Sequence, residues 1–117
     1  MQNNITRLLD SKNISYSVFQ LNSEKHSGIE TADLLGVSPE IVYKTIVVER
    51  DMPGKYILAM VPSILEVEVK KLARISGDKK VKICSQNEAE KITGLLTGGI
   101  SPLALINRGF QVIIDET

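Results

Sequence analysis

The feature that most constrains the fold is a pair of apolar, β-branched runs separated by a short connection. Lys44–Arg50 (KTIVVER) and Lys55–Pro62 (KYILAMVP) flank residues 51–54 (DMPG), in which proline and glycine supply the geometry of a tight turn. Apolar side chains fall on both faces of the second run, so we expect a central strand that is covered on both sides. The sequence therefore predicts a β-hairpin at the centre of a sheet.

Helical and strand patterns alternate along the rest of the chain. The apolar spacing or the end signals of helices occur in residues 3–12, 31–35, 38–41, 65–76 and 85–93. Strand-like alternation occurs in residues 14–21, 79–84 and 111–115. In the second of these strands Val81 and Ile83 should point inward. Strands that are joined by turns as well as by helices predict a fold of the α/β class, of the α+β type with a mixed sheet.

The composition is that of an ordinary soluble protein, with 43% hydrophobic and 24% charged residues in a chain of 117. Because no linker divides the chain, we expect one domain over residues 1–117. No run approaches the roughly 18 apolar residues that a membrane span needs. The start of the chain, MQNNITRLLD, lacks the features of a secretory signal. We therefore expect a cytoplasmic protein that does not bind membranes.

A single cysteine, Cys84, and a single histidine, His26, limit the available chemistry. Cys84 has no partner for an internal disulfide, and the two residues together cannot supply the ligands of a zinc site. We therefore expect neither a metal nor a cofactor. Cys84 ends an alternating strand, where we expect it to pack or to lie at the rim and not to attack a substrate.

Basic residues are concentrated in one stretch of a chain that is neutral overall, with 14 basic and 14 acidic residues. The six basic residues of this stretch are Lys70, Lys71, Arg74, Lys79, Lys80 and Lys82, and Asp78 is the one acidic residue. Such a local charge can dock one phosphate-bearing ligand without general affinity for DNA. It is also typical of a solvated helix face followed by an exposed strand.

Lys44 is the first candidate for a functional residue. Period-two alternation puts Lys44 on the same strand face as Val42, Ile46 and Val48. If that face is covered, the ammonium group must be paired or functional, because burying an isolated charge is costly. Lys44 is therefore either a cation aimed into a cleft or a lysine at a strand end whose stem extends to water.

The stretch TGGISP, residues 97–102, is the second candidate. Gly98 and Gly99 allow the backbone to approach a ligand closely, and Ser101 followed by Pro102 is typical of the start of a helix. Free N–H groups that converge there could bind phosphate or stabilise the oxyanion of an ester under attack. The stretch does not match the phosphate-loop or dinucleotide-binding patterns, and a plain turn before a short helix is the alternative.

Several segments, in this order, resemble the YbaK/ProX family of aminoacyl-tRNA deacylases, which is related to the editing domain of bacterial prolyl-tRNA synthetase. The matching segments are ISY at 14–16, TADLLGVSP at 31–39, VYKTIVV at 42–48, KKLA at 70–73, EAE at 88–90, TG at 93–94, GGISPL at 98–103 and IIDE at 113–116. The lysine-threonine strand followed at a distance by Gly-Gly-Ile-Ser-Pro is fairly specific as a combination.

The resemblance implies a strongly curved, mostly antiparallel and barrel-like sheet with helices around it. It also implies hydrolysis of the ester in mischarged tRNA, typically cysteine or alanine on the proline tRNA, with no cofactor. Lys44 would be the key active-site residue, Thr45 would line the same pocket, and Gly98, Gly99, Ile100, Ser101 and Pro102 would bind the aminoacyl end. His26 and Ser27 would complete the pocket. The basic stretch would meet the acceptor-stem phosphates, and prolyl-tRNA synthetase is an expected partner.

The sequence departs from the family pattern in ways that leave alternatives open. Relatives continue with a further strand and a closing helix that this sequence lacks, and Ser27 stands where cysteine-specific members often have an aromatic residue. A binding module that holds tRNA or a synthetase without cleavage is one alternative. Another is an interaction domain whose open sheet edge is completed by a second copy. We expect a monomer or a weak homodimer.

Overall fold

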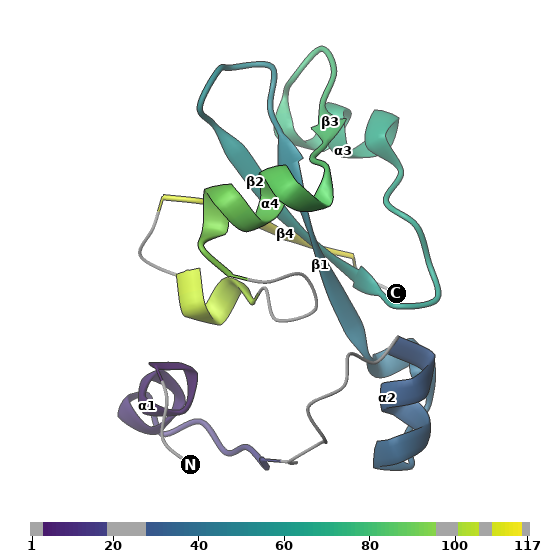
Figure 1. The fold of residues 1–117 in the computed structure, drawn as a ribbon, viewed down its shortest axis with the longest axis vertical. Helices are drawn as coiled ribbons and strands as arrows, with labels where there is room; N and C mark the ends of the chain where they lie inside the picture. Colours follow the sequence, from purple (N-terminus) through teal and green to yellow (C-terminus); the bar gives the residue numbers. More distant parts are fainter. Residues whose placement is uncertain (1–3, 19–27, 96–100, 106–108, 116–117) are drawn as a thin grey trace.

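A mixed four-stranded sheet with helices on both of its faces forms the centre of the protein (Figure 1). The computed structural model describes residues 4–18, 28–95, 101–105 and 109–115. The helices are α1 (Asn4–Ser11), α2 (Gly28–Leu35), α3 (Val69–Ser76) and α4 (Gln86–Thr93), with short 3₁₀ helices η1 (Pro39–Ile41) and η2 (Pro102–Leu105). The strands are β1 (Tyr43–Glu49), β2 (Tyr56–Pro62), β3 (Lys82–Ile83) and β4 (Gln111–Ile114).

The predicted hairpin is confirmed and forms the middle of the sheet. The strand order is β3-β1-β2-β4, in which β1 runs antiparallel to both β2 and β3, and β2 runs parallel to β4. The fold class and the mostly antiparallel sheet are therefore confirmed. The term barrel-like is too strong, because β3 and β4 stand at opposite edges of a sheet that does not close within the described residues.

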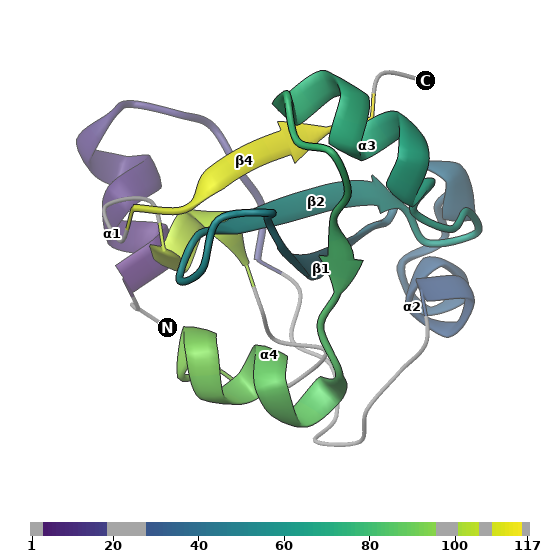
Figure 2. The same ribbon diagram turned by 90° about the horizontal axis from the view of Figure 1, so that it is seen from above.

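Each face of the sheet carries its own apolar cluster, and Figure 2 shows the covering helices α3 and α4 on opposite sides. Successive residues of a strand point to opposite faces, so β1 and β2 contribute to both clusters. On the α4 face the buried residues are Val47, Leu58, Ala89 and Leu105, and on the α3 face they are Val48, Ile57, Ala59 and Leu72. This confirms that the second strand of the hairpin is central and covered on both sides.

Local end signals correctly predict several helix boundaries. Gly77 follows α3 with a φ of 81°, in the left-handed region that glycine adopts without strain. Ser85 and Glu88 form the predicted capping box, in which each side chain accepts a hydrogen bond from the other residue's backbone N–H at 3.2 Å. These ends depend on residues that are close in sequence, which is why the sequence indicates them.

Four sequence-based expectations are wrong, mainly where the structure of a segment depends on a neighbour that is distant in sequence. Residues 14–18 do not form a strand; there the Tyr16 hydroxyl donates a hydrogen bond to the Asp10 carboxylate at 2.8 Å, beside α1. The strand predicted at 79–84 shortens to β3, because it pairs only with the last two residues of β1. Ile83 is 43% exposed and does not point into the core. Finally, α3 begins at Val69, since residues 62–65 form a turn.

Candidate functional site

Lys44 lies near the start of β1, opposite Val61 of β2. Alternation along the ladder places it on the α3 face, with Ile46 and Val48, as the sequence predicts. Its side chain is 30% exposed, and its Nζ donates a hydrogen bond to Oε1 of Glu66 at 3.4 Å. The lysine is thus partly removed from water and paired, while its ammonium group still reaches an exposed carboxylate.

The end of the hairpin beside Lys44 is held by a close contact between Ser63, the residue after β2, and the start of α2. The backbone N–H and the side-chain hydroxyl of Ser63 both donate to the carbonyl oxygen of Val42, at 2.7 and 2.6 Å. Gly28, the first residue of α2, lies so close to Ser63 that a Cβ at position 28 would overlap the Ser63 side chain. The glycine therefore allows α2 to begin against this end of the hairpin.

Thr45 does not share a strand face with Lys44. It lies opposite Met60, two residues before Val47, and alternation therefore places it on the α4 face. Ser101 and Pro102 lead into η2, whose Leu105 packs on this same face. A site that uses both Lys44 and Thr45 must therefore extend around the end of β1.

The glycine-rich stretch is only partly described by the structure. Ser101 behaves as the predicted cap, because its hydroxyl oxygen accepts a hydrogen bond from the backbone N–H of Leu103 at 3.2 Å. Gly98, Gly99 and Ile100 lie outside the described residues. His26 and Ser27 also lie outside them, so the structure does not test these predicted pocket residues.

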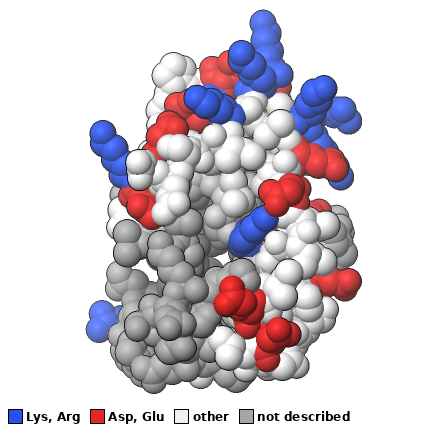
Figure 3. All heavy atoms as spheres, turned by 45° about the vertical axis from the view of Figure 1, so that its right-hand side comes forward, with Lys and Arg blue, Asp and Glu red and all other residues white. Residues whose placement is uncertain are grey.

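The basic residues of the 70–82 stretch divide between two neighbouring surfaces. Lys70, Lys71 and Arg74 line a shallow hollow beside the start of α3, whereas Lys80 and Lys82 line another beside the hairpin connection. Figure 3 shows Lys and Arg side chains gathered at the upper end of this face, with acidic side chains between them. The charges are exposed and clustered, as either a phosphate-binding surface or a solvated face requires.

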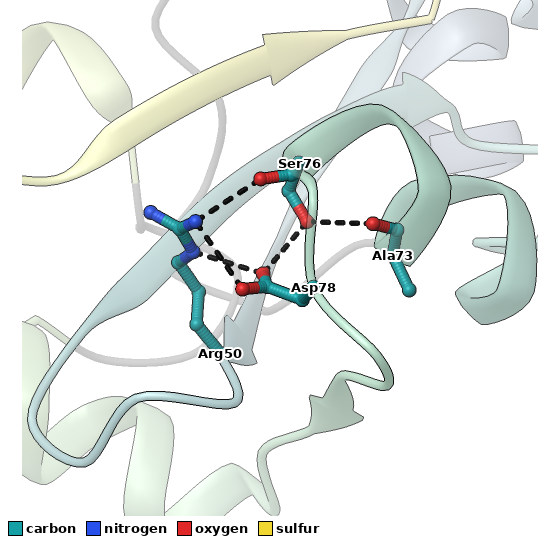
Figure 4. A network of polar contacts seen from close by, with 4 residues as sticks. All are labelled: Arg50, Ala73, Ser76 and Asp78. Carbon is teal, nitrogen blue, oxygen red and sulfur yellow. Dashed lines mark hydrogen bonds and ion pairs between the residues drawn. The ribbon is translucent and has the colours of Figure 1, made fainter.

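A polar network that sequence reasoning did not find anchors this basic stretch to β1 (Figure 4). Nε and Nη2 of Arg50 donate to the Asp78 carboxylate at 2.9 and 3.3 Å, and Nη2 also donates to the carbonyl oxygen of Ser76. The Ser76 hydroxyl donates to Asp78 as well, at 2.7 Å. These hydrogen bonds lower the pKa of Asp78, with that from Arg50 contributing most. In the sequence, this network is indicated only by Asp78, the single acidic residue among the six basic residues of the stretch.

Cys84 packs against the cluster on the α4 face and is half-buried. Burial is the main cause that raises the pKa of its thiol, and the nearby carboxylates of Glu88 and Glu49 raise it further. The thiol is therefore protonated near neutral pH and is a poor nucleophile. In the described part of the chain no three His, Cys, Asp or Glu residues are grouped as metal ligands, and no helix is long and apolar enough to cross a membrane.

The sequence of this chain matches a known family and a longer relative. The model of the aminoacyl-tRNA editing domain matches residues 23–117. A protein of Enterococcus faecalis, provisionally named as the Cys-tRNA(Pro)/Cys-tRNA(Cys) deacylase EbsC, is 32% identical over 104 residues. The match covers 87% of this chain and 63% of that protein, so this chain spans less than two thirds of its relative.

Solved structures share the fold at lower sequence identity. The crystal structure of a hypothetical protein has a TM-score of 0.86 at 21% identity, over 97% of this chain and 73% of the other. The crystal structure of a provisionally assigned trans-editing enzyme for prolyl tRNA synthetase has a TM-score of 0.74 at 18% identity, over 98% of this chain and 73% of the other. These findings confirm the resemblance seen in the sequence, and the chain belongs to the aminoacyl-tRNA editing domain family.

Proposed function

We propose that this protein is a trans-editing aminoacyl-tRNA deacylase, which hydrolyses the ester between a wrong amino acid and the 3′ end of tRNA. Family membership and the names of the relatives support an ester hydrolase that acts on mischarged tRNA. We propose Cys- or Ala-tRNA(Pro) as its substrate. The observation that carries the proposal is the partly buried side chain of Lys44, which lies near the end of the β1–β2 hairpin. We propose that residues 1–117 act as a single domain in the cytoplasm, as a monomer or a weak homodimer.

Ester hydrolysis in such a site needs positioning and charge stabilisation more than a covalent nucleophile. A water oxygen adds to the ester carbonyl carbon, and the bond from that carbon to the ribose oxygen then breaks. The ribose oxygen takes up a proton, and the products are the free amino acid and an intact tRNA 3′ end. Lys44 would hold the ester or the terminal ribose, and a fixed cation stabilises the negative charge that develops during the addition.

The remaining proposed roles complete this arrangement. The backbone N–H groups of Gly98, Gly99, Ile100 and Ser101 would donate hydrogen bonds to the carbonyl oxygen as it becomes an oxyanion. Pro102 has no N–H and would only begin η2. Thr45, His26 and Ser27 would line the pocket of the amino-acid side chain. The protonated thiol of Cys84 and its place in the core argue against a thioester intermediate.

We propose that the acceptor stem of the tRNA lies against the basic residues, with prolyl-tRNA synthetase as the enzyme whose errors are corrected. Phosphates would contact Lys70, Lys71, Arg74, Lys79, Lys80 and Lys82. All six are exposed, and five of them line the two neighbouring hollows at one end of the molecule. Binding of this kind weakens as salt rises, because it releases counterions from the nucleic acid.

The decisive experiment is a turnover assay with tRNA(Pro) charged with cysteine, alanine or serine. Wild-type protein should release at least one of these amino acids, and Lys44→Ala should lower the rate by roughly 10²–10³-fold. Lys55→Ala removes an exposed lysine of the same hairpin and is the matched control. Equal turnover in Lys44→Ala would remove Lys44 from the mechanism, provided that circular dichroism shows the variant to be folded.

The same assay separates the enzyme from a binding module of the same fold. Wild-type protein that binds tRNA in a filter assay but hydrolyses none of the three esters would contradict the proposed activity. That result would instead support the alternative in which the domain holds tRNA or a synthetase without cleavage.

A further inference from the structure

The contact between Lys44 and Glu66 brings a carboxylate to the proposed reaction centre. Glu66 lies in the connection between β2 and α3, and its side chain is 92% exposed, against 30% for Lys44. It is the one acidic partner of Lys44 in the described part of the chain. Neither the sequence pattern nor the resemblance singles out this residue.

We propose that Glu66 binds the α-ammonium group of the aminoacyl ester and so determines that the substrate carries a free amine. This inference rests on the proposed deacylase function. In an aminoacyl ester the amine-bearing carbon is bonded directly to the carbonyl carbon. A carbonyl held by Lys44 therefore places the substrate amine next to the group that Lys44 already contacts.

Charge balance gives Glu66 a specific task. An α-amino group has an ordinary pKa of about 7.7–8.0 and is mostly protonated near neutral pH. Lys44 would then lie close to a second cation, the substrate ammonium group, and repulsion between these two positive charges would oppose binding. A carboxylate that bridges the two cations converts this repulsion into attraction. The Glu66 carboxylate has two oxygens that can contact the two cations, and Oε1 contacts Lys44.

The weakness of the Lys44–Glu66 contact also fits a ligand-binding role. At 3.4 Å the two atoms are farther apart than the roughly 2.7–2.9 Å of a strong charge-assisted hydrogen bond. An ion pair with an exposed partner contributes little to stability, so its rearrangement around a substrate costs little. Glu66 is therefore free to turn toward a substrate amine while it remains beside Lys44.

The test compares two esters of the same tRNA that differ only at the α-carbon. Alanyl-tRNA(Pro) carries the ammonium group, and lactyl-tRNA(Pro) carries a neutral hydroxyl group of similar size. We expect wild-type protein to prefer the alanyl ester in kcat/KM. Glu66→Gln keeps the size of the side chain but removes its charge, and it should lower this preference by roughly fivefold. Glu66→Asp keeps the charge and should retain part of the preference.

Glu68→Gln is the matched control, because Glu68 is an exposed glutamate of the same connection and makes no side-chain bond at the start of α3. This variant should leave the preference unchanged. An equal loss in Glu68→Gln would indicate general surface charge and would overturn the proposal. Equal losses on both esters in Glu66→Gln would mean that Glu66 only positions Lys44, which would also overturn it.

The outcome for wild-type protein separates this inference from the function on which it rests. If wild-type protein hydrolyses both esters equally well, or if Glu66→Gln retains the full preference, the role of Glu66 is wrong while the deacylase function stands. If wild-type protein hydrolyses neither ester nor the cysteinyl ester, the proposed function fails and the role of Glu66 fails with it.

Discussion

At the scale of single residues, the end of the hairpin beside Lys44 depends on the absence of a side chain at Gly28. The start of α2 lies directly against Ser63, which in turn donates two hydrogen bonds to Val42. The helix position, the β2 end and the Lys44 strand are thus connected through one small contact. A larger side chain at position 28 should therefore also displace the residues around Lys44.

Gly28→Ala should destabilise the protein by about 1–3 kcal/mol, because the added methyl group overlaps Ser63 and must displace it. Urea denaturation measures the change in the free energy of unfolding. Ser63→Gly removes the overlapping atoms, so the double variant should be less destabilised than the sum of the two single variants. Simple additivity would show that the two residues are not in contact.

The thiol of Cys84 should react slowly with iodoacetamide at pH 7.5. Its raised pKa, caused mainly by burial, keeps the fraction of reactive thiolate small. Mass spectrometry of the folded protein should show a much lower rate than for the same protein in urea. Cys84→Ala should retain deacylation, and loss of activity in a folded Cys84→Ala variant would contradict the mechanism without a thiol nucleophile.

At the scale of elements, Arg50 and Asp78 fasten the loop after α3 to the end of β1. The side chains are 19% and 5% exposed, and three hydrogen bonds reach Asp78 from Arg50 and Ser76. The loop leads directly to Lys79, Lys80 and β3. The ion pair therefore fixes where this half of the basic stretch lies relative to the sheet.

Asp78→Asn should destabilise the protein at pH 7 and have a smaller effect in acid. The pKa of Asp78 is lowered in the folded state, so its contribution is fully present above the unfolded value of about 3.9. The contribution is lost as the pH falls through the lower, folded pKa. Thermal melts between pH 3 and pH 7 should show the two proteins converging toward low pH. Asp51→Asn, which removes an exposed carboxylate, is the control, and a constant difference across this range would contradict the assignment.

The elements that the sequence predicts correctly are those whose signals are local. The hairpin, the left-handed Gly77 and the capping box of Ser85 with Glu88 each depend on residues within one turn or one connection. The strand expected at 14–21 is absent over 14–18, and the strand expected at 79–84 is reduced to β3, because a strand forms only where a neighbouring strand offers a free edge. No pattern in the sequence predicts which strand edge is free to pair.

The candidate site shows the same division between local and distant information. Alternation correctly predicts the face of Lys44, whose side chain is partly buried and whose Nζ contacts the exposed Glu66. Its partner Glu66 could not be predicted, because it is brought to Lys44 by the course of the connection after β2. The pairing of Arg50 with Asp78 likewise joins residues that are distant in sequence. Alternation along β1 also places Thr45 on the face opposite that of Lys44, so its expected place in the same pocket requires a site that extends around the end of β1.

At the scale of the whole molecule, the cationic side chains gather at the end that carries the hairpin connection and α3, whereas α1 lies at the other end (Figures 1 and 3). A chain that is neutral overall can therefore present a positive surface to one ligand. Arg50 adds to the positive charge at this end of the molecule, because it neutralises Asp78, the one acidic residue of the basic stretch.

Lys80→Gln should weaken the binding of uncharged tRNA and reduce the slope of log Kd against log salt by roughly one, as expected for one lost phosphate contact. Fluorescence anisotropy over a series of salt concentrations gives this slope. Lys12→Gln removes an exposed lysine that follows α1 and should leave the slope unchanged. Equal effects of the two variants would mean that tRNA binding does not select the proposed end of the molecule.

The parallel pairing of β2 with β4 has a consequence for how the chain reaches its native state. The β1–β2 hairpin closes through the six residues 50–55 between the two strands, whereas β4 joins β2 from the far end of the sequence. Closing a long loop costs more entropy, so the hairpin should be organised in the folding transition state and β4 should dock after it. Val47→Ala should then mainly slow refolding, and Ile113→Val should mainly speed unfolding. The edge that completes the sheet would thus be both the last part to assemble and the first to detach.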